Sequence, residues 1–584
     1  MGVFSTSWDD DGGKSIEAVR QTLAHASIPL GADVAVGIAG HNTRLVGQPL
    51  AGGAHWTFAH SVDAAPILTG GLVIASGDGE LFALDALTGK LLWRRPTGGL
   101  ALRGAGDDGT VTVATLTGPL GQGSTLMAIA HDGSVLRQIE RRVDFGSPAV
   151  VSRLAFVPWN NQYVSVVDVT DGAEVGRLLV REKTSRAWLS GGSLFFGELG
   201  IYRFDDKIKD ASRGGADHLA LPAKVLPGRP LAFRPIDDPA KAVAGAADKI
   251  RLFARPTSLA EPQPLAFDSG RFYATYFRLV FGLSADQEKL AWVHTHGSAV
   301  IGGAAAVGAV VICDADGNVS TLASSNGAQL GSPLAMGEPL ESCVVQADGL
   351  RTQAVVVEPG TLVQQIQLAL SDRDLELDAG QRWLLRALAG FQDEAGTDLL
   401  VRLATDSRLS PGMLEDVRAL VAGRRTGARY LEEALDHHYD FLHDSLVRPP
   451  VGPIALALAG MKDVHATAAL VRHLFDPADS DQDVRDVAQA LAVLAQPGDA
   501  PALLHFFALY HDAPPEPVAM AQAVNAVAEA LLRVGGAEGK AAISAAIVHS
   551  GTNAVVRAKL SALLDAESLQ RGTPSMTPSS TSRE

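Results

Sequence analysis

Short apolar runs alternate with glycine-bearing polar turns along the first 370 residues. The clearest segment extends from Gly70 to Trp93, where an Asp-Gly turn at 78–79 and a Thr-Gly turn at 88–89 separate three apolar runs. Glycine permits the positive φ angles of tight reversals, so this pattern predicts a meander of antiparallel strands.

The same pattern recurs at 163–176, 279–292 and 317–331. The copies fall near multiples of about 40 residues, a period typical of the four-stranded blades of a β-propeller. Seven to eight blades fit the range 31–370, and we expect eight. We also expect 34–56 to add outer strands to the blade formed by 340–370, which would close the ring.

The large residue that ends each unit, Trp or Leu, is expected to pack between adjacent sheets. A tryptophan at such a position, for example Trp93 or Trp292, is therefore expected to have a structural role.

Helical spacing of Ala and Leu replaces the strand pattern after Leu370. The string LAGFQD at 388–393 returns as LAGMKD at 458–463. Each repeat unit is predicted to be an apolar helix, a polar turn near an Asp and a second apolar helix. Stacked helix pairs of this length predict an α-solenoid, whose concave surface suits a protein partner.

These patterns predict a multidomain β plus α chain. We expect a lead-in with a short helix over 1–30, a β-propeller over 31–370, helical repeats over 371–568, and a disordered tail rich in Ser, Thr and Pro over 569–584.

Composition narrows the classes of partner. The 49 basic and 65 acidic residues give a formal charge of −16, which disfavours nucleic acid as a partner. The sequence contains no run of about 18 apolar residues, so we expect no transmembrane segment. No motif for nucleotide binding or for a hydrolase nucleophile occurs in a strand–helix context.

The string from Gly79 to Trp93, GELFALDALTGKLLW, resembles the repeat of the pyrroloquinoline-quinone-like propellers. Quinone enzymes of that family carry an adjacent pair of cysteines and a calcium ion held by Glu and Asn. This chain has no adjacent cysteines, so it resembles the non-enzymatic branch, which includes outer-membrane protein assembly factor B. The string from Asp483 to Leu491 resembles the second helix of a HEAT repeat.

The resemblance implies a non-catalytic scaffold that binds other proteins, in particular envelope or membrane proteins. It implies a place in the periplasm or tethered to the outer membrane, with the leader missing from this chain. Two alternatives remain open: a quinone- or metal-dependent oxidoreductase, and a cytoplasmic adaptor.

The two cysteines, Cys313 and Cys343, lie in predicted strands at 309–313 and 342–346. Strands this far apart can be neighbours across a blade junction, so a disulfide is plausible and would indicate an oxidising compartment. The alternative is a pair of small buried thiols.

Three sets of polar residues are candidate binding sites. In the predicted helix 428–447, one face carries Glu433, His437, Asp440 and Asp444, a weak candidate for a divalent metal that also fits an ordinary acidic surface. His294 and His296 share one side of a strand, where a polar surface pair is the simpler interpretation. The segment 314–318 begins like a calcium loop, but its glycine stands at the wrong position, so we interpret it as a blade turn. We assign no catalytic residue and no cofactor.

Overall fold

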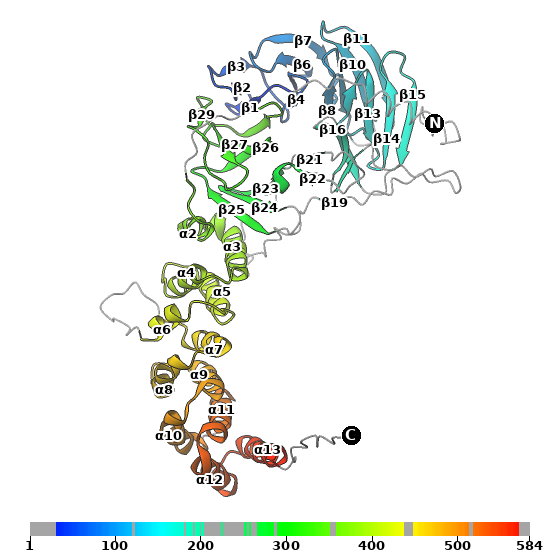
Figure 1. Cartoon of the computed structure of the whole chain (residues 1–584). Helices are drawn as coiled ribbons and strands as arrows, with labels where there is room; N and C mark the ends of the chain where they lie inside the picture. Colours follow the sequence, from blue (N-terminus) through cyan, green and yellow to red (C-terminus); the bar gives the residue numbers. More distant parts are fainter. Residues whose placement is uncertain are drawn as a thin grey trace, which may run out of the picture. The chain divides into compact units, whose positions relative to one another are not determined.

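The computed structural model describes residues 31–119, 123–179, 183–190, 193–198, 200–203, 224–225, 250–253, 256–257, 266–284, 289–350, 358–436, 448–512 and 518–571. The chain divides into two compact units, Met1–Gly380 and Gln381–Glu584 (Figure 1). The first unit is rich in antiparallel strands and the second is helical. The predicted lead-in helix lies outside the described residues.

The described part of the first unit contains seven four-stranded antiparallel sheets, numbered here 1 to 7, and the two-stranded sheet β21–β22. Sheet 1 contains β1 (Val34–Ala39), β2 (Arg44–Pro49), β3 (Trp56–Ala59) and β30 (Ser342–Gln346); sheet 2 contains β4 (Ile67–Thr69), β5 (Leu72–Gly77), β6 (Glu80–Asp85) and β7 (Leu91–Pro96); and sheet 3 contains β8 (Ala101–Asp107), β9 (Val111–Thr117), β10 (Ser124–Ala130) and β11 (Val135–Arg141). Sheet 4 contains β12 (Ala149–Val151), β13 (Leu154–Trp159), β14 (Tyr163–Asp168) and β15 (Glu174–Leu179), and sheet 5 contains β16 (Thr184–Ser190), β17 (Ser193–Glu198), β18 (Gly200–Arg203) and β19 (Lys224–Val225). Sheet 6 contains β20 (Ile250–Phe253), β23 (Arg271–Tyr276), β24 (Leu279–Ser284) and β25 (Leu290–Thr295); sheet 7 contains β26 (Val300–Ala306), β27 (Ala309–Asp314), β28 (Asn318–Ala323) and β29 (Leu334–Ala335); and the two-stranded sheet contains β21 (Pro256–Thr257) and β22 (Ala266–Phe267).

Sheet 1 contains strands from both ends of the β-rich unit. Strand β30 pairs antiparallel with β1, from Val34 opposite Gln346 to Ile38 opposite Ser342. The Glu341 carboxylate accepts the backbone N–H groups of His41 and Asn42 at 2.6 and 3.0 Å. The strands of 34–56 thus join a strand of the predicted blade 340–370, as expected, but Leu362–Ser371, at the end of that range, is a helix.

The sheets form a propeller-like series. Contacts join sheet 6 to 7, 7 to 1, 1 to 2, 2 to 3, 3 to 4 and 4 to 5. Seven sheets match the lower end of the predicted range. The expected eighth blade stays a prediction, because 204–223 and 226–249 lie outside the described residues.

Tryptophans seal several of these junctions against a glycine turn of the next sheet. The pairs are Trp56 with Gly89, Trp93 with Gly133, and Trp292 with Gly327. In the first and third pairs the indole also donates a hydrogen bond to a buried backbone carbonyl, at 3.0 Å to Ala86 and 2.9 Å to Ser324. Gly89 and Gly327 have φ of +68° and +72°, and a Cβ on either would lie 2.5 Å from the indole ring. The turn glycine therefore serves both the reversal and the packing.

The β-rich unit ends in a helix that the strand pattern does not predict. Helix α2 (Leu362–Ser371) packs on β25, and the Gln365 side chain accepts the Val293 N–H at 3.0 Å. The Arg278 guanidinium pairs with Asp372 and Asp374. The apolar face of α2 is therefore buried against sheet 6, and the helix belongs to the β-rich unit.

Helix pairs make up the second unit. The described helices are α3 (Asp378–Gly390), which begins in the first unit, α4 (Glu394–Ala404), α5 (Pro411–Val421), α6 (Ala428–Asp436), α7 (Val451–Met461), α8 (Thr467–His473), α9 (Asp481–Leu494), α10 (Ala500–Tyr510), α11 (Val518–Val534), α12 (Gly536–Val548) and α13 (Ala554–Arg571). The described parts of both units also contain the short 3-10 helices η2 (Asp268–Gly270), η3 (Leu375–Leu377), η4 (Val464–Ala466) and η5 (Pro497–Asp499).

The helices contact one another in two rows. One row runs through α5, α7, α9, α11 and α13, and the other includes α4, α6 and α8, then α10 and α12. Buried alanines, including Ala488 and Ala490 of α9 and Ala523 of α11, permit close approach. Among the described helices, none has the length and apolar character needed to cross a bilayer.

Candidate functional site

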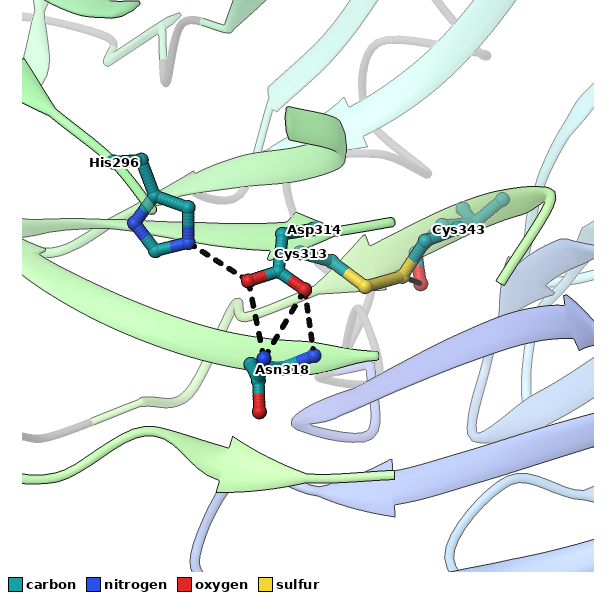
Figure 2. The surroundings of a disulfide bond; sticks show 6 residues. His296, Cys313, Asp314, Asn318 and Cys343 are labelled. Atoms are coloured by element: carbon teal, nitrogen blue, oxygen red, sulfur yellow. Dashed lines mark hydrogen bonds and ion pairs between the residues drawn. A yellow bond between two sulfur atoms is a disulfide. The ribbon is translucent and has the colours of Figure 1, made fainter. Parts of the chain in front are cut away.

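The two cysteines meet at the junction between sheets 7 and 1. Cys313 lies on β27 and Cys343 on β30, and a disulfide joins their side chains with the Cα atoms 6.4 Å apart (Figure 2). Their exposed fractions are 0% and 7%. Gly302 of β26 lies so close to Cys343 that a Cβ there would be 2.1 Å from the Cys343 carbonyl oxygen. The bond is therefore buried within a tightly packed interface.

A histidine–aspartate pair stands beside the disulfide. Asp314 follows Cys313 and pairs with His296 Nε2 at 2.9 Å, while the Asn318 backbone N–H donates to Asp314 at 2.8 Å (Figure 2). Burial acts to raise the pKa of Asp314, but these hydrogen bonds outweigh it and hold the pKa below its usual value. Both carboxylate oxygens have partners within the turn, which supports the interpretation of 314–318 as a blade turn.

The structure brings His294 and His296 near each other but gives them different surroundings. Their ring centroids are 5.8 Å apart. Burial, with a smaller effect of His296, lowers the pKa of His294 to about 4, so this imidazole is neutral near pH 7. Only His296 contacts Asp314, and the geometry is that of a polar pair rather than a shared ligand set.

The metal-ligand candidate on 428–447 lies mostly outside the described residues. Glu433 is exposed on α6, and α6 ends at Asp436. His437, Asp440 and Asp444 fall in the segment 437–447, for which the structure gives no description. The candidate site stays a prediction.

A different cluster, which the sequence reasoning missed, contains His473, Asp476 and Asp479 between α8 and α9. Their ligand atoms lie within 4.8 Å of one another. The Arg448 guanidinium pairs with both carboxylates, at 2.5 Å to Asp476 and 2.9 Å to Asp479. His473 donates from Nδ1 to the Asp479 carboxylate at 2.9 Å and from Nε2 to the Leu435 carbonyl at 3.1 Å. An arginine already supplies the positive charge, so the cluster is an ion-pair network that fixes the α8–α9 loop.

The spacing of that cluster, one acidic residue at every third position after His473, was a signal available in the sequence. Burial acts to lower the pKa of His473, but the hydrogen bonds to Asp479 and to the Leu435 carbonyl, together with the charges of Asp479 and Asp476, outweigh it and raise the pKa.

A similar histidine–aspartate pair occurs in sheet 3, and here no local spacing in the sequence indicates it. The Asp107 carboxylate accepts the Thr112 hydroxyl at 2.6 Å and pairs with His131 at 2.8 Å. The hydrogen bond to Asp107 raises the pKa of His131. Both histidine pairs connect neighbouring strands or turns, which is a structural role.

A groove of about 1170 Å³ opens beside sheet 3. Polar side chains of β11, Gln138, Glu140 and Arg141, line it together with the apolar Leu100 and Met127. The lining therefore combines apolar and charged side chains, as surfaces that bind proteins do.

Comparison with known proteins gives one family match. The family described as "Outer membrane protein assembly factor BamB" matches residues 16–207. This range covers sheets 2 to 4 and parts of sheets 1 and 5. Among curated proteins, no relative matches the sequence.

Similar solved structures cover about half of the chain. BamB from Moraxella catarrhalis is 15% identical over 54% of this chain and 86% of its own, with a TM-score of 0.28. Apo AztD from Citrobacter koseri is 10% identical over 54% of this chain and 97% of its own, with a TM-score of 0.35. The dihydro-heme d1 dehydrogenase NirN is 14% identical over 54% and 76%, with a TM-score of 0.34. Similarity at this level assigns no activity to the chain.

Proposed function

We propose that this protein is a non-catalytic scaffold of the bacterial cell envelope, with a β-propeller and a HEAT-like α-solenoid that bind other proteins. The observation that carries the proposal is the family match over residues 16–207, together with the repeated sheets found in that range. The buried disulfide supports an oxidising compartment such as the periplasm. The groove beside sheet 3 and the helix rows supply partner surfaces.

Site-directed photo-crosslinking in intact envelopes tests the proposal. A photoreactive residue at Gln138 reports on the groove, and one at Leu509, which is 51% exposed on α10, reports on the helical unit. A matched probe at Val307, which is 53% exposed in a turn of sheet 7, serves as the control. We expect an adduct with components of outer-membrane β-barrel assembly from the first or second probe and none from the control.

Two outcomes contradict the scaffold proposal. Recovery of the protein only from the cytosol, with both cysteines reacting with a thiol reagent before any reduction, supports the cytoplasmic adaptor. A visible absorbance band that copurifies with the folded protein supports the oxidoreductase. Each outcome is read on the native protein without a variant.

A further inference from the structure

The junction between sheets 7 and 1 is filled differently from the junctions that contain tryptophan. Its buried core consists of small and flexible residues, namely Ala35, Ala39, Val46, Ala306, Ala309, Val311, Cys313, Val319, Met336, Leu340, Cys343, Val345 and Ala347. No tryptophan belongs to this described core. The disulfide spans the junction, because Cys313 comes from sheet 7 and Cys343 from sheet 1.

The hydrogen bonds of β30 lie mainly within sheet 1, but the Leu340 N–H just before β30 donates to the Ala315 carbonyl in the β27–β28 turn of sheet 7 at 2.9 Å. Strand β30 pairs with β1, Glu341 accepts from the β1–β2 turn, and Glu338 pairs with Arg44 at 2.8 Å. Strand β30 forms no ladder with a strand of sheet 7. Sheet 7 is held to β30 by side-chain packing, by the segment between β29 and β30 with its backbone hydrogen bond from Leu340 to Ala315, and by the disulfide.

Strand β27 presents one face to each neighbouring junction. Val310 and Ile312 pack in the cluster that contains Trp292, on the side of sheet 6. Val311 and Cys313 pack in the cluster shared with sheet 1. Val310 and Cys313 are both fully buried, so one strand carries a matched pair of positions for the two junctions.

We propose that the Cys313–Cys343 disulfide is the latch of the sheet 7–sheet 1 junction, and that reduction opens this junction while the tryptophan-sealed junction on the other face of β27 stays closed. Closure brings the two thiols together. Oxidation removes two protons and two electrons, which pass to an external disulfide that becomes a dithiol. Reduction by a dithiol reverses this exchange and returns two thiols.

The native fold shields the Cys313–Cys343 disulfide from reducing agents. Thiol–disulfide exchange needs a thiolate to reach one of the sulfur atoms, and the two cysteines are 0% and 7% exposed. We therefore expect dithiothreitol to reduce the native protein at least 100-fold more slowly than the urea-unfolded protein. Equal rates in the two states would overturn the shielding and with it the latch.

Native-state thiol labelling distinguishes local opening from general loosening. In reduced wild-type protein, mass spectrometry follows iodoacetamide labelling of Cys313. The control protein carries Cys313→Ala, Cys343→Ala and Val310→Cys, so its one thiol lies on the opposite face of β27. We expect Cys313 to be labelled at least tenfold faster than the thiol at position 310. Equal labelling rates would overturn the proposal, because both junctions would then open together.

A second variant separates the covalent bond from packing. Val345→Ala removes two methyl groups from β30 at a site that is 8% exposed in the same junction, and leaves the disulfide intact. We expect the difference in melting temperature between oxidised and reduced protein to persist in this variant and to vanish in the Cys313→Ala, Cys343→Ala double variant. If the double variant does not fold, the melting temperatures of oxidised and reduced protein, compared for the wild type and for Val345→Ala, still test the latch. An unchanged melting temperature on reduction would overturn the latch.

Discussion

Two neighbouring junctions of the β-rich unit, one on each face of β27, contain different kinds of buried side chains. On the sheet 6 side, Trp292 lies on Gly327 and bonds the Ser324 carbonyl. On the sheet 1 side, the packing residues are mostly Ala and Val, and a disulfide crosses the interface. The first junction joins sheets that follow each other along the chain. The second joins sheet 7 to sheet 1, which begins at residue 34 and is completed by β30. Side-chain packing is supplemented by a covalent bond where the two ends of the strand series meet.

Truncation of the tryptophan gives the largest expected effect. Trp292→Ala should lower the free energy of unfolding by about 4 kcal/mol, because a large buried side chain is lost and a cavity remains. Urea denaturation measures this change. Val307→Ala, at an exposed position in sheet 7, should cost less than about 0.5 kcal/mol. A small effect of Trp292→Ala would mean that the two junctions are equivalent after all.

A glycine substitution tests whether the indole needs its turn. Gly327→Ala should cost about 3 kcal/mol, since it combines a positive φ with a Cβ 2.5 Å from the Trp292 ring. The matched control is Gly308→Ala, where φ is +68° and nothing lies within 4 Å of the added Cβ. That control should cost about 1 kcal/mol, from the backbone alone. Equal losses at the two positions would show that packing on Trp292 contributes nothing.

The helix that covers sheet 6 supplies a further test. Gln365→Ala removes the acceptor of the buried Val293 N–H and should cost about 2 kcal/mol. The neighbouring Gln364 is the control, because its side chain bonds only the exposed N-terminal turn of α2. Calorimetry of the two variants measures the difference. If Gln364→Ala lowers the free energy of unfolding as much, the packing of α2 on β25 depends on the N-terminal cap of the helix instead.

The smallest expected effect concerns pH. The pKa of His294 is lowered to about 4 in the folded protein. Between pH 6.5 and pH 4 this imidazole is therefore protonated in the unfolded chain but neutral in the folded one. This histidine therefore destabilises the fold progressively as pH falls from about 6.5 to about 4. We expect His294→Gln to reduce the loss of stability between pH 7 and pH 5, by roughly tenfold in the unfolding equilibrium constant. The variant's stability profile over that range, measured by urea denaturation, should be flatter than that of the wild type, and a steeper profile contradicts the assignment.

Much of the β-rich unit could be predicted because each unit carries its turn residues with it. Thr88-Gly89 and Trp93 mark a turn and a strand end in the sequence, and the strand over 342–346 has the predicted bounds. Helix α2 was not predicted, because the whole range 31–370 was assigned to strands from its repeat pattern. The burial of Ile366 and Leu370 on this helix depends on a sheet formed by other parts of the chain.

The polar pairs show why sites are harder to predict than elements. His296 and Asp314 both attracted notice in the sequence, but their contact depends on the packing of sheet 6 against sheet 7. Arg448 reaches Asp476 and Asp479 from a separate loop, so no local spacing reveals that the acidic cluster already has its counter-charge.

Sheet 1 also sets the order of events during biosynthesis. The partners that meet at Glu341 and His41 are separated by 300 positions along the chain. At roughly 5–20 residues per second, the ribosome needs on the order of 15–60 s to deliver β30 after β1 has emerged. Throughout that interval β1 has one unpaired edge, which is an exposed template for the wrong strand. The nascent chain therefore has an exposed strand edge until its distant partner is made, and a holdase chaperone that covers β1 would protect this edge during the interval.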